Sequence, residues 1–285
     1  MANLNAIPGA DVSHPQQGVD LHWPASAIWR PGEPKVHAIG VADLRDAVAK
    51  GIEDFKAMPS HAVFLCIIYP AIGFILFRLM FGYDILPLIY PLLAGFTLIG
   101  PAAAIGLYEL SRRRERGLDT SVWHLLDVFW SPSIGAIARL SLALLAIFFA
   151  WLATAQLMYE QTFGNAVPPS LEAFTRQILT TPAGHQLLVV GNSIGFLCAV
   201  LVLAISFVSF PMLVDRTVGA ATAVRTSIRA ALATPLTVAI WGLFVAAALV
   251  VGSLPFFVGL AVIFPVLGHA TWHLYRKVVS VAEVI

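Results

Sequence analysis

Two histidines near the C-terminus have the spacing of metal ligands on a helix. His269 and His273 are four residues apart, beside Trp272, and would share one helical face. In the zinc-binding helix of metalloproteases, two histidines at this spacing share a metal and a glutamate acts as base. The motif here, His-Ala-Thr-Trp-His, has no glutamate. We therefore favour histidines that hydrogen-bond to neighbouring helices, and predict no metal and no cofactor.

Charged residues at the ends of apolar segments are the next candidates. Glu109 follows Tyr108, and Asp215 and Arg216 follow the apolar run 210–214. Ionisable groups at membrane depth are costly and often serve proton or ion transfer. Ion pairs that close a helix bundle are the alternative, and we favour it for Asp215 with Arg216 and for Glu109 with an arginine of residues 112–116. The candidate polar cluster, on the cytoplasmic side, consists of Glu109, Asp215, Arg216, His269 and His273.

A basic run follows Glu109. It contains Arg112, Arg113, Arg114 and Arg116. Such a run stops translocation and attracts anionic lipid, at about 1 kcal/mol per basic residue. We predict a lipid-facing basic cluster that fixes the topology.

The elements that would position these residues are transmembrane helices. Of the 285 residues, 59% are hydrophobic and only 12% are charged, and the mean hydropathy is +0.83. A soluble domain carries about 25% charged residues. Six segments can cross about 30 Å of hydrocarbon: 61–82, 87–110, 134–158, 186–211, 235–253 and 255–275. The sequence predicts an all-α membrane protein with six transmembrane helices.

The distribution of basic residues predicts the orientation. Of the 17 lysines and arginines, all but Arg78 and Arg176 fall on one side of this arrangement. Because basic residues accumulate on the cytoplasmic side, both termini are predicted to be cytoplasmic. Residues 1–39 form an irregular cytoplasmic tail, 40–280 the membrane domain and 281–285 a cytoplasmic end.

An internal repeat is predicted from the segments that precede the odd-numbered spans. Amphipathic helices are expected near 43–58, 119–131 and 217–232, lying in the cytoplasmic interface with their apolar faces toward lipid. Their apolar stripes are Leu44, Val48, Ile52 and Phe55 in the first, Val122, Leu125, Leu126 and Phe129 in the second, and Ala221, Val224, Ile228 and Leu232 in the third. Pro59, Pro132 and Pro235 follow them, and proline suits the first turn of the next helix. We predict three copies of an interfacial helix plus a transmembrane hairpin.

Four stretches carry a family resemblance: residues 90–96, 99–109, 209–216 and 264–276. They resemble a bacterial family of uncharacterised integral membrane proteins, some of which are labelled cytochrome c oxidase subunit I-like. The resemblance implies a multi-pass protein of the bacterial inner membrane and says little about activity. A haem–copper subunit binds its metals through histidines from several helices. Here only His61, His185, His269 and His273 lie in or beside spans.

The functional prediction is a non-enzymatic membrane protein. The sequence has no phosphate-binding glycine-rich loop, no Gly-x-Ser-x-Gly elbow and no Cys-x-x-Cys. We expect an accessory, scaffold or assembly subunit of a membrane complex, such as a respiratory one, whose partners are lipids and other membrane protein subunits. A carrier for a small or amphipathic solute is the alternative, and a haem- or metal-binding subunit is the third. The net charge of +1 gives no reason to expect nucleic acid.

Overall fold

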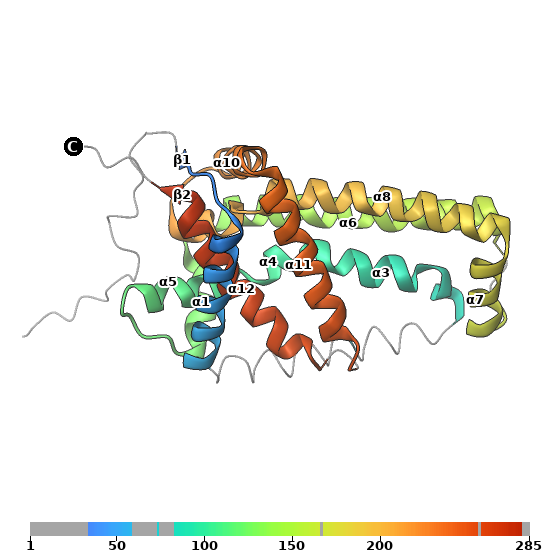
Figure 1. Cartoon of the computed structure of the whole chain (residues 1–285), viewed down its shortest axis with the longest axis horizontal. Helices are drawn as coiled ribbons and strands as arrows, with labels where there is room; N and C mark the ends of the chain where they lie inside the picture. Colours follow the sequence, from blue (N-terminus) through green and yellow to red (C-terminus); the bar gives the residue numbers. More distant parts are fainter. Residues whose placement is uncertain (1–33, 59–72, 74–82, 166–167, 256–257, 281–285) are drawn as a thin grey trace, which may run out of the picture.

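Long helices that run side by side dominate the fold (Figure 1). The computed structural model describes residues 34–58, 73, 83–165, 168–255 and 258–280. Within these residues, four stretches of helix are long and apolar enough to cross a membrane: Leu86–Glu115, Ile134–Phe163, Pro182–Asp215 and Pro235–Ser253.

The described elements are almost all helical. The first half of the chain contains β1 (Lys35–Val36), α1 (Val41–Ala57), η2 (Tyr83–Leu88), α3 (Ile89–Phe96), η3 (Thr97–Ile99), α4 (Gly100–Ala103), α5 (Ile105–Glu115) and η4 (Val122–Trp130). The second half contains α6 (Ile134–Phe163), α7 (Leu171–Thr180), α8 (Pro182–Ser206), α9 (Ser209–Asp215), α10 (Ala220–Ala233), α11 (Pro235–Ser253), α12 (Leu260–Val278) and β2 (Val279–Ser280).

The centre of the bundle is the pair α6 and α8, with α3 alongside (Figure 1). Gly195 of α8 lets the ring of Trp151 approach, because a Cβ there would lie 3.1 Å from that ring. The indole nitrogen of Trp151 donates to the carbonyl of Pro91 at 2.9 Å. The Gly-x-x-x-Gly spacing of α8 thus serves packing within the bundle, as small residues do in membrane helices.

Prolines interrupt two of the candidate spans. The second predicted span is divided into α3, η3, α4 and α5, because a proline inside a helix removes a backbone donor and crowds the preceding turn. The fourth is divided at Phe207 and Val208, ahead of Pro211. There α10 satisfies the released backbone groups. Ser227 Oγ donates to the Ala204 carbonyl at 2.8 Å and accepts from the Val208 amide at 3.3 Å.

At one end of the bundle, opposite α7, α1 packs lengthwise on α12 (Figure 1). Strands β1 and β2 pair antiparallel beside them, so the predicted irregular tail contains a short strand among its described residues. Gly51 makes the close packing possible. A Cβ there would lie 2.7 Å from both the Ala270 nitrogen and the Val266 oxygen, which are backbone atoms.

Gly51→Ala is therefore expected to destabilise the protein by about 1–3 kcal/mol, because the added methyl group overpacks against the backbone of α12. The measurement is the free energy of unfolding in detergent micelles. Gly135→Ala is the matched control, because a Cβ at Gly135 meets nothing within 4 Å. Equal stability of the two variants would contradict the packing of α1 on α12.

The six predicted spans correspond only in part to the described helices. The segment 61–82 lies outside the described residues. The segment 255–275 corresponds to α12, which is not among the four candidate spans because it carries Pro265, two histidines, Arg276 and Lys277. The other four predicted spans fall within the four candidate spans. Six spans in three repeats stays a prediction.

The segments predicted to be interfacial are helical, but their buried faces differ from the predicted stripes. In α1 the buried residues are Leu44, Ala47, Gly51 and Asp54, whereas Ile52 is exposed. In α10 they are Ala223, Thr226, Ser227 and Ala230, and Leu232 is exposed. The middle segment is the 3₁₀-helix η4. Its spacing of three residues per turn aligns Trp123, Leu126 and Phe129, all of which are exposed.

Candidate functional site

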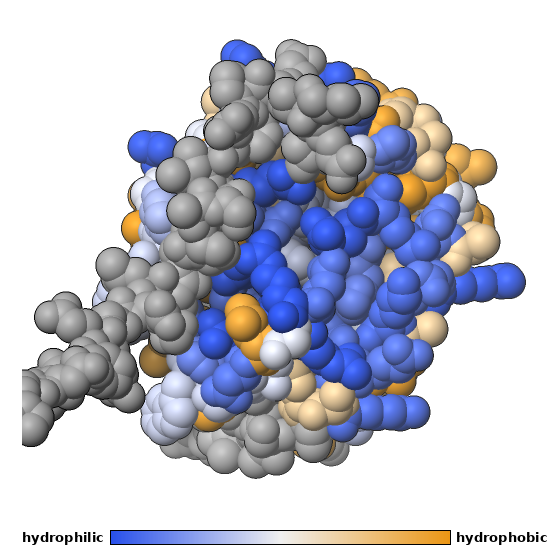
Figure 2. Space-filling view, turned by 90° about the vertical axis from the view of Figure 1, so that its left-hand side faces the viewer, coloured by the Kyte–Doolittle hydropathy of each residue, from blue (hydrophilic) through white to orange (hydrophobic). Residues whose placement is uncertain are grey.

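Charged side chains gather at the end of the bundle formed by α1, α5, η4, α9 and the C-terminal half of α12, which we call the charged end. Figure 2 looks onto this end and shows hydrophilic residues across its centre and hydrophobic residues at its rim. The helix α5 contacts η4, α12 and α9. Its charged residues follow one another along the chain and therefore point to several neighbours.

Asp54 of α1 joins three helices. It is 3% exposed. Its Oδ2 accepts from Ser111 Oγ at 2.6 Å and lies 2.9 Å from His273 Nε2, while its Oδ1 accepts from Arg114. Ser111 Oγ lies 2.7 Å from the Nδ1 of the buried His269. Asp54 therefore connects α1 to α5 and, through both histidines, to α12.

The pKa of Asp54 is below its usual value. Burial alone would raise this pKa, because a charged carboxylate loses hydration. The hydrogen bonds from His273 and Ser111, together with the charges of the two histidines, lower the pKa by more than burial raises it. Asp54 is therefore ionised at neutral pH and holds its partners as a carboxylate. A second contact between α1 and α12 lies nearby, where Lys277 Nζ is 3.0 Å from both Asp43 and Asp46.

Glu109 and Arg112 form an ion pair inside the protein. Glu109 is 0% exposed and Arg112 is 1% exposed. The guanidinium donates through Nε at 2.7 Å and through Nη2 at 2.6 Å, one bond to each carboxylate oxygen. This two-bond geometry is the strongest form of such a pair. The predicted pairing of Glu109 with an arginine of the basic run is present.

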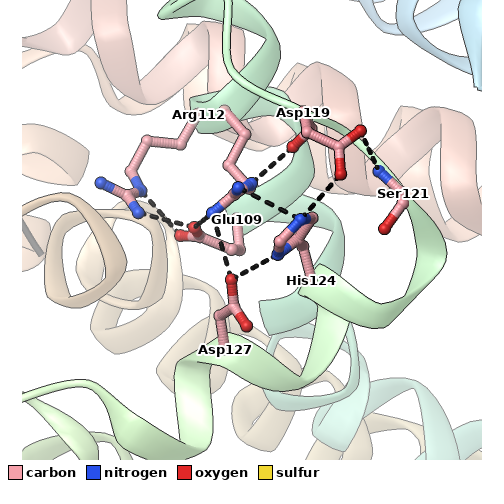
Figure 3. A network of polar contacts seen from close by, with 7 residues as sticks. Glu109, Arg112, Asp119, Ser121, His124 and Asp127 are labelled. Atoms are coloured by element: carbon pink, nitrogen blue, oxygen red, sulfur yellow. Dashed lines mark hydrogen bonds and ion pairs between the residues drawn. The ribbon is translucent and has the colours of Figure 1, made fainter. Parts of the chain in front are cut away.

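Arg113 connects α5 to η4. Figure 3 shows the residues of this group that it labels, with His124 between Asp119 and Asp127. Its Nη1 donates to Asp127 at 3.1 Å, and its Nε donates to the Asp119 carbonyl at 2.6 Å. The ring of His124 lies between two carboxylates, with Nδ1 2.7 Å from Asp127 and Nε2 2.9 Å from Asp119. Arg113 Nη2 lies 3.2 Å from the same Nε2. The hydrogen bond from His124 keeps the pKa of Asp119 below its usual value.

Asp215, at the end of α9, collects donors from α12 and from the residue that follows α5. Tyr275 donates to its Oδ2 at 2.8 Å, Arg116 to its Oδ1 at 3.0 Å, and Arg276 lies 3.4 Å away. The predicted pair with Arg216 is present at 3.4 Å. Glu115, next to Arg116, extends this group by accepting from Trp272 and Arg276, each at 3.0 Å.

The helix that carries most of these charges, α5, lies in a segment that is similar to a known protein family. Residues 89–215, from α3 to α9, match the model of a family described as "Predicted integral membrane protein (DUF2189)". We call residues 89–215 the DUF2189 segment, because they are similar to that family. Neither the curated proteins nor the solved structures gave a match. Together with the apolar helices, the match identifies an integral membrane protein.

The DUF2189 segment holds only one side of the polar network. Glu109, the basic run and Asp215 lie within it, whereas Asp54, His269, His273 and Tyr275 lie outside it. Among the described residues, the contacts of Glu109 with Arg112, of Arg113 and His124 with acids of residues 119–127, and of Arg116 with Asp215 are complete inside the segment. Residues on α1 and α12 complete the rest, and therefore attach these two helices to the DUF2189 segment.

The prediction that the basic run faces lipid is wrong for two of its members. Arg112 and Arg113, 1% and 3% exposed, are buried because Glu109 and Asp127 neutralise them inside the protein. Arg114 and Arg116 are partly exposed, and they contact Asp54 and Asp215. The run therefore joins helices of the protein to one another.

The candidate cluster divides into separate groups at the charged end. His269 and His273 share Asp54, Asp215 and Arg216 share Tyr275, and Glu109 pairs with Arg112. Among the described residues, no group of three or more histidines, cysteines and acids is placed to hold a metal ion. Sequence reasoning did not select Asp54 as a candidate site residue. The sequence feature that could have indicated Asp54 is its helical spacing from Ala47 and Gly51. These two small residues lie on the same face of α1 as the Asp54 carboxylate.

Proposed function

We propose that this chain is an accessory or scaffold subunit of the bacterial inner membrane, without catalytic activity. Its charged end faces the cytoplasm and meets lipids and other membrane protein subunits. The observation that carries the proposal is the mutual pairing of charges around α5. Arg113, Arg114, Arg116 and Glu115 reach η4, α1, α9 and α12 in turn. Such pairing favours a rigid arrangement of these helices that other subunits can bind over a catalytic site with free reactive groups.

The orientation and the number of spans belong to the same proposal. Apart from Arg176 on α7, the basic residues of the described elements belong to β1, α1, α5, α6, α10 and α12, or directly follow α5 or α9. The positive-inside rule then favours a cytoplasmic charged end and cytoplasmic termini. Segment 61–82 and α12 would complete six spans in three units. The start of α11 at Pro235 supports the proline corner of the third unit.

Two other functions receive less support. A carrier needs a cavity between its spans, whereas the hollow of about 390 Å³ that the described residues line lies on α8, at Asn192, Ser193, Phe196 and Leu197. A haem or metal site on His269 and His273 would have to break their bonds to Ser111 and Asp54. These contacts favour the hydrogen-bonding role for both histidines.

The outer face of α1 is the surface we expect a partner subunit to contact. It carries Val41, Arg45, Ile52 and Lys56, all exposed, opposite the face that holds Asp54. Its mixture of apolar and basic side chains suits an acidic helix with an apolar edge. The buried face of α1 keeps this surface in place.

The test is native mass spectrometry of the complex extracted in mild detergent. We expect a second polypeptide in stoichiometric amount, and we expect the double variant Arg45→Glu, Lys56→Glu to lose it while keeping the melting temperature of the wild type. Glu53→Gln, on the same helix, is the control and should keep the partner. A spectrum with only this chain and lipid would overturn the proposal.

A further inference from the structure

Arg139 differs from the other arginines of the candidate spans. These spans contain four arginines: Arg112, Arg113, Arg114 and Arg139. The first three pair with Glu109, Asp127 and Asp54. Arg139 is exposed, and no carboxylate among the described residues lies within ion-pair distance of it. A permanently charged guanidinium on a membrane helix needs a partner of opposite charge.

The position of Arg139 along α6 gives its depth. The next charged residue of the helix is Glu160, and the 20 residues between them are uncharged. At 1.5 Å per residue these span about 30 Å, which is the thickness of the hydrocarbon core. Arg139 therefore lies at the boundary between hydrocarbon and headgroups, on the side of the charged end.

The described residues around Arg139 leave it open to the outside of the helix bundle. Gly135, one turn earlier, and Leu142, one turn later, are both exposed on the same side of α6. A Cβ at Gly135 would meet nothing within 4 Å. Trp130, just before the helix, is 78% exposed, and tryptophan favours the headgroup level of a membrane.

We propose that Arg139 binds the phosphate of a phospholipid headgroup. The guanidinium offers two parallel donors that match two phosphate oxygens. The open position of Gly135 leaves room for the headgroup beside the helix, and the first acyl carbons would run along Leu142. This site deepens the proposed function, since it names the lipid contact that the scaffold makes from within the membrane.

Retention of lipid tests the proposal. The purified chain is exchanged into detergent with phosphatidylglycerol, and bound lipid is counted by native mass spectrometry. We expect Arg139→Gln to bind the lipid about fivefold more weakly, as expected for one basic residue, and Arg139→Lys to fall between. Arg176→Gln, an exposed arginine of α7 at the opposite end of the bundle, is the control. Unchanged binding by Arg139→Gln, with an unchanged melting temperature, would refute the site.

A cross-link distinguishes lipid from protein as the occupant. Gly135→p-benzoylphenylalanine places a photoreactive group in the open position beside Arg139, and irradiation in cells should add the mass of a phospholipid to the chain. A cross-link to a polypeptide instead would mean that an acidic side chain of another subunit occupies the site. That result refutes the lipid site and leaves the proposed scaffold function standing.

Discussion

Asp54→Ala is expected to lower the free energy of unfolding by about 3–5 kcal/mol, as measured by denaturant titration in detergent micelles. The substitution removes the acceptor of Ser111, His273 and Arg114 at once. It leaves polar groups of α5 and α12 without their partner at a site that is closed to water. Because Asp54 is the residue through which α1 contacts both helices, we also expect α1 to become accessible to proteases first.

The control is the next residue of the same helix. Glu53 is exposed and makes none of these contacts, so Glu53→Ala should change stability by less than about 0.5 kcal/mol. Asp54→Asn keeps the shape of the side chain and one acceptor oxygen but loses the charge. Its loss of stability should lie between those of Glu53→Ala and Asp54→Ala. If Asp54→Ala were as stable as Glu53→Ala, the polar network would not hold α1.

The same residue predicts how stability depends on pH. A carboxyl with a depressed pKa in the folded protein stabilises it above the pKa of the unfolded chain, and that contribution is lost as the pH falls through the lower, folded value. The stability difference between wild type and Asp54→Ala should therefore remain down to about pH 4 and shrink below it. A difference that disappears between pH 5 and 7 would mean that burial dominates and the pKa is raised.

Much of the fold could be predicted because membrane spans follow from apolar length. Segments 134–158 and 235–253 correspond closely to α6 and α11, and the proline at 235 begins α11 as the sequence indicated. The ends of the spans were less predictable. Helix breaks occur near the prolines at 101 and 211, but the backbone bonds that Ser227 supplies at the second break come from a different helix.

The polar network could not be predicted because its partners are distant in the sequence. Arg114 and Asp54 are separated by 60 residues, and Arg276 and Glu115 by 161. Hydrophobic periodicity also did not indicate which face of α1 packs on α12. Ala47 and Gly51 add little to an apolar stripe, yet their small size is what lets α12 approach, and this turns Asp54 inward.

The structure also changes the role of the basic run. A cluster of arginines after an apolar segment indicates topology, and the orientation proposed above still uses it. The burial of Arg112 and Arg113 shows that the same residues also act in packing, which a charge count cannot reveal because it carries no information about burial. The buried pair of Glu109 and Arg112 is where this second role has its largest expected effect.

Glu109→Leu and Arg112→Met, each made alone, are expected to destabilise the protein by about 3–5 kcal/mol, because each leaves an opposite charge buried without its partner. The double variant should recover most of that loss, since two apolar side chains of similar volume replace the pair without an unmatched charge. The recovery will be incomplete because Arg113, 3.8 Å from Glu109, also loses a neighbour.

The measurement is a double-mutant cycle on the free energy of unfolding in micelles, which isolates the interaction between the two side chains. The matched exposed pair is Lys50 and Asp46 on α1, 3.1 Å apart, for which little coupling is expected. Additive losses at Glu109 and Arg112 would show that the two residues act separately. Strong coupling with near recovery would show that their charges are retained for something other than stability, and a fixed arrangement of α5 beneath the other helices of the charged end is the role the structure offers.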